Sequence, residues 1–214
     1  MRGQALLLLS LAAGCAPRAD VEVDRRAGVE AAGRLWIDTR LPAEFAAGHR
    51  PGALNLQWDW DQLSERVRAY VPERATPITL RATTPGEAAR AAAALLELGY
   101  EDVERAPAEV EGETQRLPLL TAAELRERLH GERAPTVIDV RSAAEFATGT
   151  IPGALLVDQD EAAALVVELD RARTYAVICE GGYRSSQLAS WMRSHGFEHA
   201  SNVIDGMAAW RALR

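Results

Sequence analysis

Short apolar runs alternate with amphipathic stretches along this chain. The clearest example is the run Tyr175–Ile178, which is followed by a turn with two glycines and then by a helical pattern over 185–195. A run of this length next to turn residues predicts a buried strand. Strands that alternate with helices predict βα units on a mostly parallel sheet, so we expect an α/β fold.

Capping signals predict several helix starts. The segments Thr84–Glu87, Thr121–Glu124 and Ser142–Glu145 each begin with a hydroxyl and end, three residues later, with a carboxylate. Such a pair satisfies free N–H groups reciprocally and predicts the first turn of a helix. The other expected elements are strands at 77–80, 136–139, 155–157 and 202–204 and helices at 161–169 and 208–213.

The chain carries one pattern twice. Asp38-Thr39-Arg40, Ala43-Glu44-Phe45 and Pro51-Gly52-Ala53-Leu54 match Asp139-Val140-Arg141, Ala144-Glu145-Phe146 and Pro152-Gly153-Ala154-Leu155 at a spacing of 101, and Gly99-Tyr100 matches Gly196-Phe197 at a spacing of 97. Tandem duplication explains this self-similarity. We therefore divide the chain into a first unit, residues 20–112, and a second unit, residues 113–214, with a linker over 106–117. Each unit is predicted to be a mostly parallel sheet flanked by helices.

Composition and charge exclude several classes of function. The chain has 31 acidic and 24 basic side chains, a net charge of −7, and no run of Lys or Arg. Nucleic acid is therefore not an expected partner. The four histidines are scattered without ligand spacing and without paired cysteines, so we predict no metal site.

Residues 1–19 have the pattern of an export signal. A positive start precedes an apolar stretch over 5–13, and small residues precede Cys15. The stretch is shorter than the roughly 20 residues that a membrane-spanning helix needs. A cysteine after small residues is similar to the lipobox of bacterial lipoproteins. That similarity implies lipid on Cys15 as the mature N-terminus, membrane anchoring and a periplasm-facing location. The alternatives are secretion without lipid and a segment that is not an export signal.

Cys179 is the strongest candidate for chemistry. It begins the loop Cys179–Arg184 directly after a predicted strand, and successive N–H groups in such a loop predict an anion-binding nest. The dipole of the following helix and the charge of Arg184 both favour the nucleophilic thiolate. If Cys15 carries lipid, Cys179 has no disulfide partner, since the chain has two cysteines.

Several residues near Cys179 have open interpretations. The carboxylate of Glu180 opposes a thiolate, and a buried structural cysteine is the alternative role for Cys179 itself. Asp139 and Arg141 end the neighbouring strand and are possible lining residues, although a buried ion pair that involves Glu145 is the interpretation we favour. Tyr183 either faces a substrate or covers the sulfur from water.

Together these motifs resemble the tandem rhodanese-domain sulfurtransferases over nearly all of the chain after the export signal. The resemblance rests on the repeated Asp-x-Arg, Glu-Phe and Gly-x-x-Pro-Gly-Ala segments, the Cys-x-x-Gly-x-Arg loop at 179–184 and Asp205-Gly206-Met207-x-x-Trp210. It implies two rhodanese-like domains, of which the first is inactive because it lacks the loop cysteine.

The resemblance also implies a reaction. Cys179 would accept a sulfane sulfur from a small donor such as thiosulfate, hold it as a persulfide and pass it to a thiol or cyanide. The terminal sulfur would be cradled by the loop residues Glu180, Gly181, Gly182, Tyr183, Arg184 and Ser185. This chemistry requires no general base and no cofactor. Glu180 departs from the basic residues of thiosulfate-specific members, which makes a less anionic persulfide an alternative donor.

Other activities remain as alternatives. Phosphatases with a related thiol loop have one residue more between cysteine and arginine than the four in this loop, which favours sulfur over phosphorus chemistry. A non-catalytic rhodanese-like scaffold is one competing hypothesis. A redox sensor that forms sulfenic acid on Cys179 is another.

Overall fold

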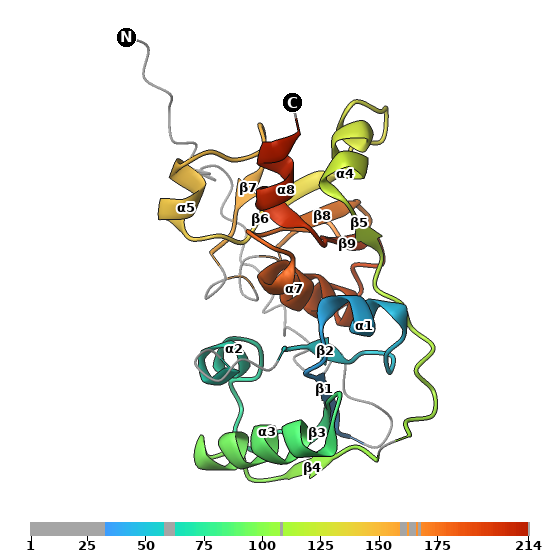
Figure 1. Ribbon diagram of the computed structural model, residues 1–214, viewed down its shortest axis with the longest axis vertical. Helices are drawn as coiled ribbons and strands as arrows, with labels where there is room; N and C mark the ends of the chain where they lie inside the picture. Colours follow the sequence, from blue (N-terminus) through green and yellow to red (C-terminus); the bar gives the residue numbers. More distant parts are fainter. Residues whose placement is uncertain are drawn as a thin grey trace, which may run out of the picture.

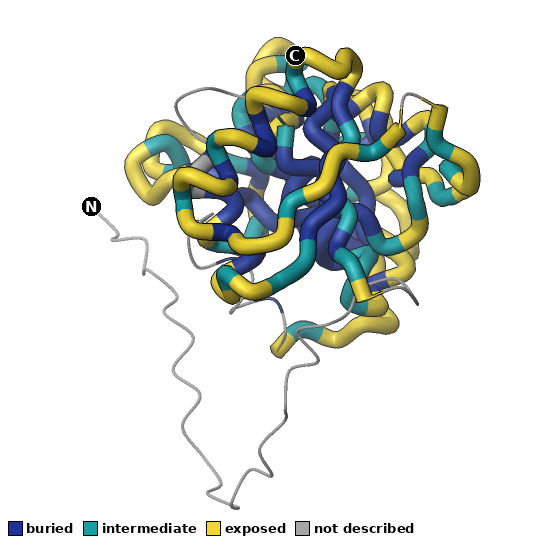
Figure 2. The backbone as a smooth tube through the Cα atoms, turned by 90° about the horizontal axis from the view of Figure 1, so that it is seen from below, coloured by how far each residue is buried: buried dark blue, intermediate teal, exposed yellow. Residues whose placement is uncertain are grey.

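The computed structural model describes residues 33–57, 63–107, 109–158 and 168–213, together with Ala162 and Val166. Two sheets of parallel strands lie one above the other along the long axis of the molecule (Figure 1). Buried segments gather inside the molecule and exposed segments surround them (Figure 2). The predicted α/β fold with two mostly parallel sheets is confirmed. The predicted export signal and Cys15 lie outside the described residues.

The first unit contributes a four-stranded sheet in the order β2-β1-β3-β4. Its elements are β1 (Leu35–Asp38), α1 (Pro42–Ala47), β2 (Leu54–Asn55), α2 (Leu63–Tyr70), β3 (Ile78–Arg81), α3 (Pro85–Glu97) and β4 (Val103–Arg105). All three pairs of neighbouring strands are parallel, as expected when helices connect successive strands.

The second unit contributes a five-stranded parallel sheet in the order β5-β9-β8-β6-β7. Its elements are β5 (Leu119–Leu120), α4 (Ala122–Leu129), β6 (Thr136–Asp139), α5 (Ala143–Ala147), β7 (Leu155–Leu156), β8 (Tyr175–Ile178), α7 (Tyr183–Ser194), β9 (Ala200–Val203) and α8 (Gly206–Ala212). Strands β6 to β9 take the same places as β1 to β4, and β5 adds an edge next to β9.

Strand register fixes which residues of the two units correspond. Asp38 pairs with Arg81 in the first sheet, and Asp139 pairs with Ile178 in the second. The residue after Arg81 is Ala82, and the residue after Ile178 is Cys179. Ala82 therefore stands at the sheet position of Cys179. The spacing of matched residues falls from 101 to 97 between Leu54/Leu155 and Gly99/Gly196, so this segment is four residues shorter in the second unit.

The predicted helix caps are confirmed. Thr84, Thr121 and Ser142 each accept a hydrogen bond from the N–H group three residues later, with the reciprocal carboxylate in place. Other element ends differ from the prediction by one or two residues: the strands lie at 78–81, 155–156 and 200–203, and the helices begin at 183 and 206. The helix predicted over 161–169 falls largely outside the described residues.

The early start of α7 has a clear physical cause. Gly182 adopts φ of +88° at the N-cap and turns the chain directly into the helix. This left-handed conformation is accessible to glycine at little cost. β9 also begins early, because Ala200 and Ser201 are buried and pair with β8, which their small side chains did not reveal in the sequence.

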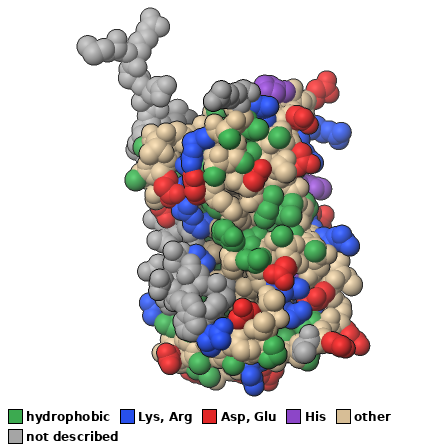
Figure 3. Space-filling model, in the orientation of Figure 1, with side chains coloured by type: hydrophobic (Ala, Val, Ile, Leu, Met, Phe, Trp, Pro, Cys, Tyr) green, Lys and Arg blue, Asp and Glu red, His purple; other side chains and the backbone are tan. Residues whose placement is uncertain are grey.

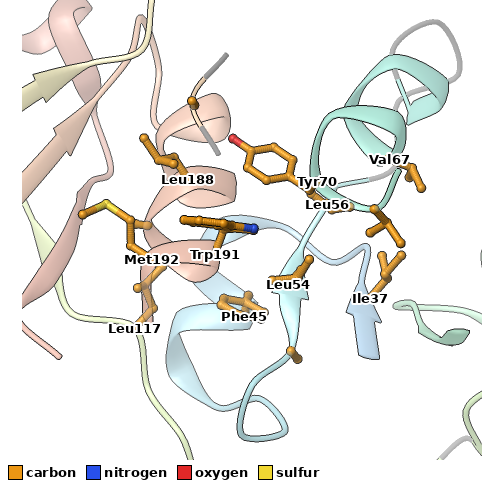
Figure 4. Close-up of a cluster of buried hydrophobic side chains, with 14 of the residues drawn as sticks. Ile37, Phe45, Leu54, Leu56, Val67, Tyr70, Leu117, Leu188, Trp191 and Met192 are labelled. Atoms are coloured by element: carbon orange, nitrogen blue, oxygen red, sulfur yellow. The ribbon is translucent and has the colours of Figure 1, made fainter. Parts of the chain in front are cut away.

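Helix α7 lies between the two units (Figure 1). Its residues from Ser185 to Met192 are all buried. One hydrophobic cluster joins Phe45 and Leu54 of the first unit to Leu188 and Trp191 of α7 (Figure 4). The helix that follows the cysteine loop is therefore part of a core shared by both units.

The molecular surface gives few functional clues. Acidic and basic side chains are interspersed on the face in Figure 3, without a block of one sign. Within the described ranges, no helix has both the length and the apolar character needed to cross a bilayer. The same residues contain no group of three His, Cys, Asp or Glu side chains placed to bind a metal ion.

Candidate active site

Cys179 lies at the carboxyl end of β8, the edge of an open α/β sheet where ligands bind. Its sulfur accepts hydrogen bonds from the Gly182 N–H at 3.1 Å and from the Ser185 hydroxyl at 3.3 Å. These donors stabilise negative charge on the sulfur. Only 1% of the residue is exposed.

The first turn of α7 is open to an anion. Unlike α3, α4 and α5, α7 has no side chain that caps its N-terminus, because Gly182 is the N-cap. N–H groups at a helix start carry the positive end of the helix dipole. The loop thus directs backbone donors and a partial positive charge toward Cys179.

Two glycines permit close packing around the loop. A Cβ at Gly182 would collide with the backbone of Ile204, and a Cβ at Gly206 would lie 2.6 Å from the Cys179 carbonyl oxygen. Both residues also have positive φ. The sequence reasoning included Gly182 in the loop, but it did not explain why glycine is required at Gly206.

Helix α8 fixes the carbonyl side of the loop. The N–H of Met207 donates to the Cys179 carbonyl at 2.8 Å, and the N–H of Ala208 donates to the Glu180 carbonyl at 3.1 Å. The Asp205 side chain accepts from the N–H of Ala122 at the start of α4. The segment Asp205–Met207 therefore anchors the cysteine loop to the rest of the unit, while the Gly182 N–H donates to the sulfur.

Arg184 forms a bidentate ion pair with Glu145 of α5, with both contacts at 2.7 Å. The hydrogen bonds from Arg184 lower the pKa of Glu145 to about 2. The pKa of Arg184 is raised, first by Glu145 and further by its attraction to Cys179. Arg184 thus lies close to the sulfur, but its charge is shared with a carboxylate that the sequence reasoning had assigned elsewhere.

Asp139 and Arg141 pair with each other. Their closest contact is 2.8 Å, both are at most 1% exposed, and Arg141 also donates to the Gly149 carbonyl. Thr150 donates to the Asp139 carboxylate at 2.8 Å. The expected pair with Glu145 was wrong, because Glu145 projects from α5 to Arg184 instead. The buried ion pair exists, with a different carboxylate.

Two arginines face the carboxylate of Glu180. Arg211 of α8 donates to one oxygen, and Arg141 lies 3.7 Å from the other. An opposite charge at this distance offsets much of the field that a lone carboxylate would exert. The repulsion expected from Glu180 is therefore weaker than the sequence alone suggests.

The remaining loop residues differ in exposure and in their contacts. Gly181 and Tyr183 are exposed, with 47% of Tyr183 accessible, and both interpretations of Tyr183 stay open. Asn202 of β9 donates to the Gly182 carbonyl at 3.1 Å from a fully buried position. Sequence reasoning missed Asn202, because an asparagine within a short strand gave no signal of contact with a loop 20 residues earlier.

The matching edge of the first unit is an open hollow of about 500 Å³. Its walls are the segment 81–85 and the segment 103–107. No helix follows β4 in the described part of the linker, so among the described residues no helix corresponds to α8 at this loop. Glu113 of the linker instead contacts Arg81 at 3.1 Å. Thr84 and Glu87 cap α3 with side chains, whereas α7 has no side-chain cap.

The chain has two α/β units with parallel sheets, and the second carries a thiol loop at the end of a central strand. This combination is typical of rhodanese-like domains. The family of rhodanese-like domains matches residues 23–105 and 121–213, and the chain belongs to this family. The tandem arrangement predicted from the repeats is therefore confirmed, with one match in each half of the chain.

Three similar proteins each match less than half of this chain. The thiosulfate sulfurtransferase GlpE of Pseudomonas putida is 31% identical over 100 residues, which are 47% of this chain and 87% of that protein. YtwF of Bacillus subtilis is 32% identical over 91 residues, 42% of this chain and 87% of its own length. A rhodanese-like domain protein of Staphylococcus aureus, known from a crystal structure, is 31% identical with a TM-score of 0.42 and covers 44% of this chain and 91% of its own.

Proposed function

We propose that the protein is a sulfurtransferase that carries a sulfane sulfur on Cys179. The observation that carries this proposal is the pair of hydrogen bonds from Gly182 and Ser185 to the Cys179 sulfur, at the uncapped start of α7. An adduct of one sulfur places its negative charge near the same donors. Membership of the rhodanese-like family and the named activity of GlpE support this chemistry.

The transfer takes two displacement steps. The Cys179 thiolate attacks the outer sulfur of the donor; with thiosulfate, the sulfur–sulfur bond breaks and its electron pair leaves with sulfite. An acceptor thiolate or cyanide then attacks the terminal sulfur of the persulfide. The bond to Cys179 breaks, and its electron pair regenerates the thiolate. Nucleophile and leaving group are anions in both steps, so neither step needs a general acid or base.

The first unit supports the reaction without performing it in this proposal. Ala82 stands in the place of Cys179, and Glu87 is offset from Arg184 by the same 97 positions. At the start of α3, a capping box occupies the N–H groups of Thr84 and Glu87. We assign catalysis to the second unit alone.

We propose that the protein is exported and anchored in the membrane by lipid on Cys15, facing the periplasm. The proposal rests on the charged, apolar and small-residue pattern of residues 1–19. Mass analysis of protein from a membrane fraction tests it. A diacylglyceryl adduct on Cys15 that disappears in Cys15→Ser supports anchoring, and an unmodified N-terminus ahead of residue 15 contradicts it.

Intact mass spectrometry tests the sulfur-transfer proposal. Purified protein is incubated with thiosulfate or with glutathione persulfide and analysed without reductant. We expect an increment of one sulfur that is lost in Cys179→Ser and retained in Cys15→Ser, the matched control at the other cysteine. The increment should disappear when cyanide or a thiol is added. Absence of any adduct with either donor contradicts the proposal.

A second candidate is a binding module, and the 1% exposure of Cys179 favours it. In that case the loop stays closed and the sulfur is inert. Iodoacetamide distinguishes the two, because a working thiol reacts in the native protein and an inert one reacts only after unfolding. Rapid sulfenic acid formation with peroxide, faster than persulfide formation, would instead support a redox sensor.

A further inference from the structure

A buried asparagine of the first unit bonds to helix α7, which follows the cysteine loop. Asn55 ends β2 and is fully buried. Its side-chain amide donates to the carbonyls of Asp38 and Arg40 at 3.1 and 2.9 Å. Two bonds within its own unit therefore hold the side chain in one orientation.

The other polar groups of Asn55 bond to the second unit. Its side-chain oxygen accepts from the Ser186 hydroxyl at 2.6 Å, and its backbone N–H donates to the Ser190 hydroxyl at 3.0 Å. Both serines belong to α7 and are at most 2% exposed. Hydrogen bonds that are buried from water on both sides fix the rotation and height of the helix relative to β2.

The first turn of α7 also holds the sulfur. Ser186 follows Ser185, whose hydroxyl donates to Cys179, and the Ser186 N–H donates to the Gly182 carbonyl at 3.2 Å. The Gly182 N–H is the second donor to the sulfur. A displacement of Ser186 therefore moves both donors that stabilise the thiolate.

The fold by itself does not require asparagine at this position. Asn55 pairs with Asp38 in the first sheet, and Leu156 pairs with Asp139 at the same position of the second sheet. Leu156 is 38% exposed. The polar residue occurs where the strand meets α7, and an apolar residue occurs where it does not.

We propose that Asn55 is a positioning residue for the reaction at Cys179. The non-catalytic unit, through Asn55, holds the first turn of α7 so that Gly182 and Ser185 point at the sulfur. This inference rests on the proposed function for its biological meaning, while the geometry of the thiol can be tested without it.

The test compares Asn55→Ala and Ser186→Ala with Val67→Ala, which removes a fully buried side chain of the first unit on α2, away from α7 in Figure 4. Ser186→Ala removes one hydroxyl and leaves the first unit intact, so it carries the test if Asn55→Ala does not fold. Persulfide formation is measured well below the melting temperature. We expect a decrease of about tenfold in the first two variants and of less than about twofold in the control, by analogy with the loss of one buried hydrogen bond.

A pH profile separates positioning from stability. The rate of Cys179 alkylation is measured against pH, and we expect its midpoint to shift to higher pH in Asn55→Ala and Ser186→Ala, since the thiolate loses aligned donors. The double variant should show little more effect than either single variant. Profiles that coincide with Val67→Ala overturn the proposal. If the wild type forms no persulfide but the alkylation profile shifts, the proposed function fails and the positioning role stands.

Discussion

The two units contain the same Asp–Arg ion pair, but a different second carboxylate lies near the arginine in each. Arg40 donates to Asp38 and to the Gly48 carbonyl, just as Arg141 donates to Asp139 and to the Gly149 carbonyl. The additional carboxylate differs. Glu113 of the linker contacts Arg40, whereas Glu180 of the cysteine loop faces Arg141. The buried pair is therefore scaffold in both units.

The starts of α3 and α7 show where the units diverge. Thr84 and Glu87 cap the start of α3 by accepting from each other's backbone N–H groups. Gly182 caps α7 with backbone alone, and its N–H turns to the sulfur of Cys179. The comparison teaches that, in the proposed reaction, the absence of a side-chain cap on α7 matters as much as the thiol.

The largest expected effect comes from removing the thiol, which is the clearest difference between the two units. Cys179→Ser should reduce sulfur transfer by at least about a thousandfold, because a hydroxyl is a poor nucleophile and cannot form a persulfide. Ala82→Cys, which places a thiol at the matching position of the first unit, should not restore transfer in the Cys179→Ser background. Rates are measured by sulfite release from thiosulfate. Recovery of activity in the double variant would show that the helix start is unimportant.

Substitution at Gly206 tests the packing that the first unit lacks. We expect Gly206→Ala to lower the free energy of unfolding by about 3 kcal/mol, because its Cβ would meet the carbonyls of the cysteine loop at a positive φ. Gly153→Ala is the matched control, since Gly153 also has positive φ but faces open space. It should cost about 1 kcal/mol. Equal losses in urea unfolding would contradict the role of close packing.

His49 makes the first unit sensitive to acid. Burial lowers its pKa from 6.5 to about 4. Between these pH values the unfolded state binds a proton that the folded state does not. The contribution of His49 to the free energy of unfolding is therefore fully present above about pH 6.5 and is lost as the pH drops toward 4. The matching residue of the second unit is Thr150, which does not titrate.

The expected loss from His49 at pH 5 is about 2 kcal/mol relative to pH 7.5. Urea unfolding of the wild type and His49→Gln at both pH values measures it. The variant loses the same packing at both pH values. The loss of unfolding free energy between pH 7.5 and pH 5 in the wild type, minus that in the variant, is therefore the contribution of His49 protonation. A variant that is destabilised by acid as strongly as the wild type would exclude this source.

The smallest expected effect concerns the choice of donor. Glu180→Gln should raise the rate with thiosulfate about threefold to fivefold relative to a neutral persulfide, because Arg141 and Arg211 lose a competing carboxylate. Glu113→Gln changes the matching contact of the first unit and should leave the ratio unchanged. The ratio of kcat/KM values for the two donors is the measurement, and high salt should reduce the difference.

Local signals made much of the fold predictable. Repeats separated by 101 positions revealed two similar units, hydroxyl and carboxylate pairs located three helices, and Tyr175–Ile178 was recognised as a buried strand. These signals lie within a few residues of the element that they specify. The loop after β8 was likewise evident, because a cysteine between an apolar run and two glycines is a local pattern.

Long-range contacts were beyond the reach of the sequence. Arg184 selects Glu145 from several acidic residues, and the choice depends on where α5 lies in space. Asn55 and Ser186 are separated by 131 positions, so neither residue alone indicates the bond between them. Arg211 and Glu180 meet for the same reason, since α8 folds back over the loop.

The shared position of α7 has a consequence for synthesis of the protein. A ribosome must reach residue 194 before the first unit receives the helix that covers Phe45 and Leu54. Until then, the nascent first unit presents an apolar surface to its surroundings. Such a surface is a binding site for chaperones, and the molecule completes its core only when its last third has been translated.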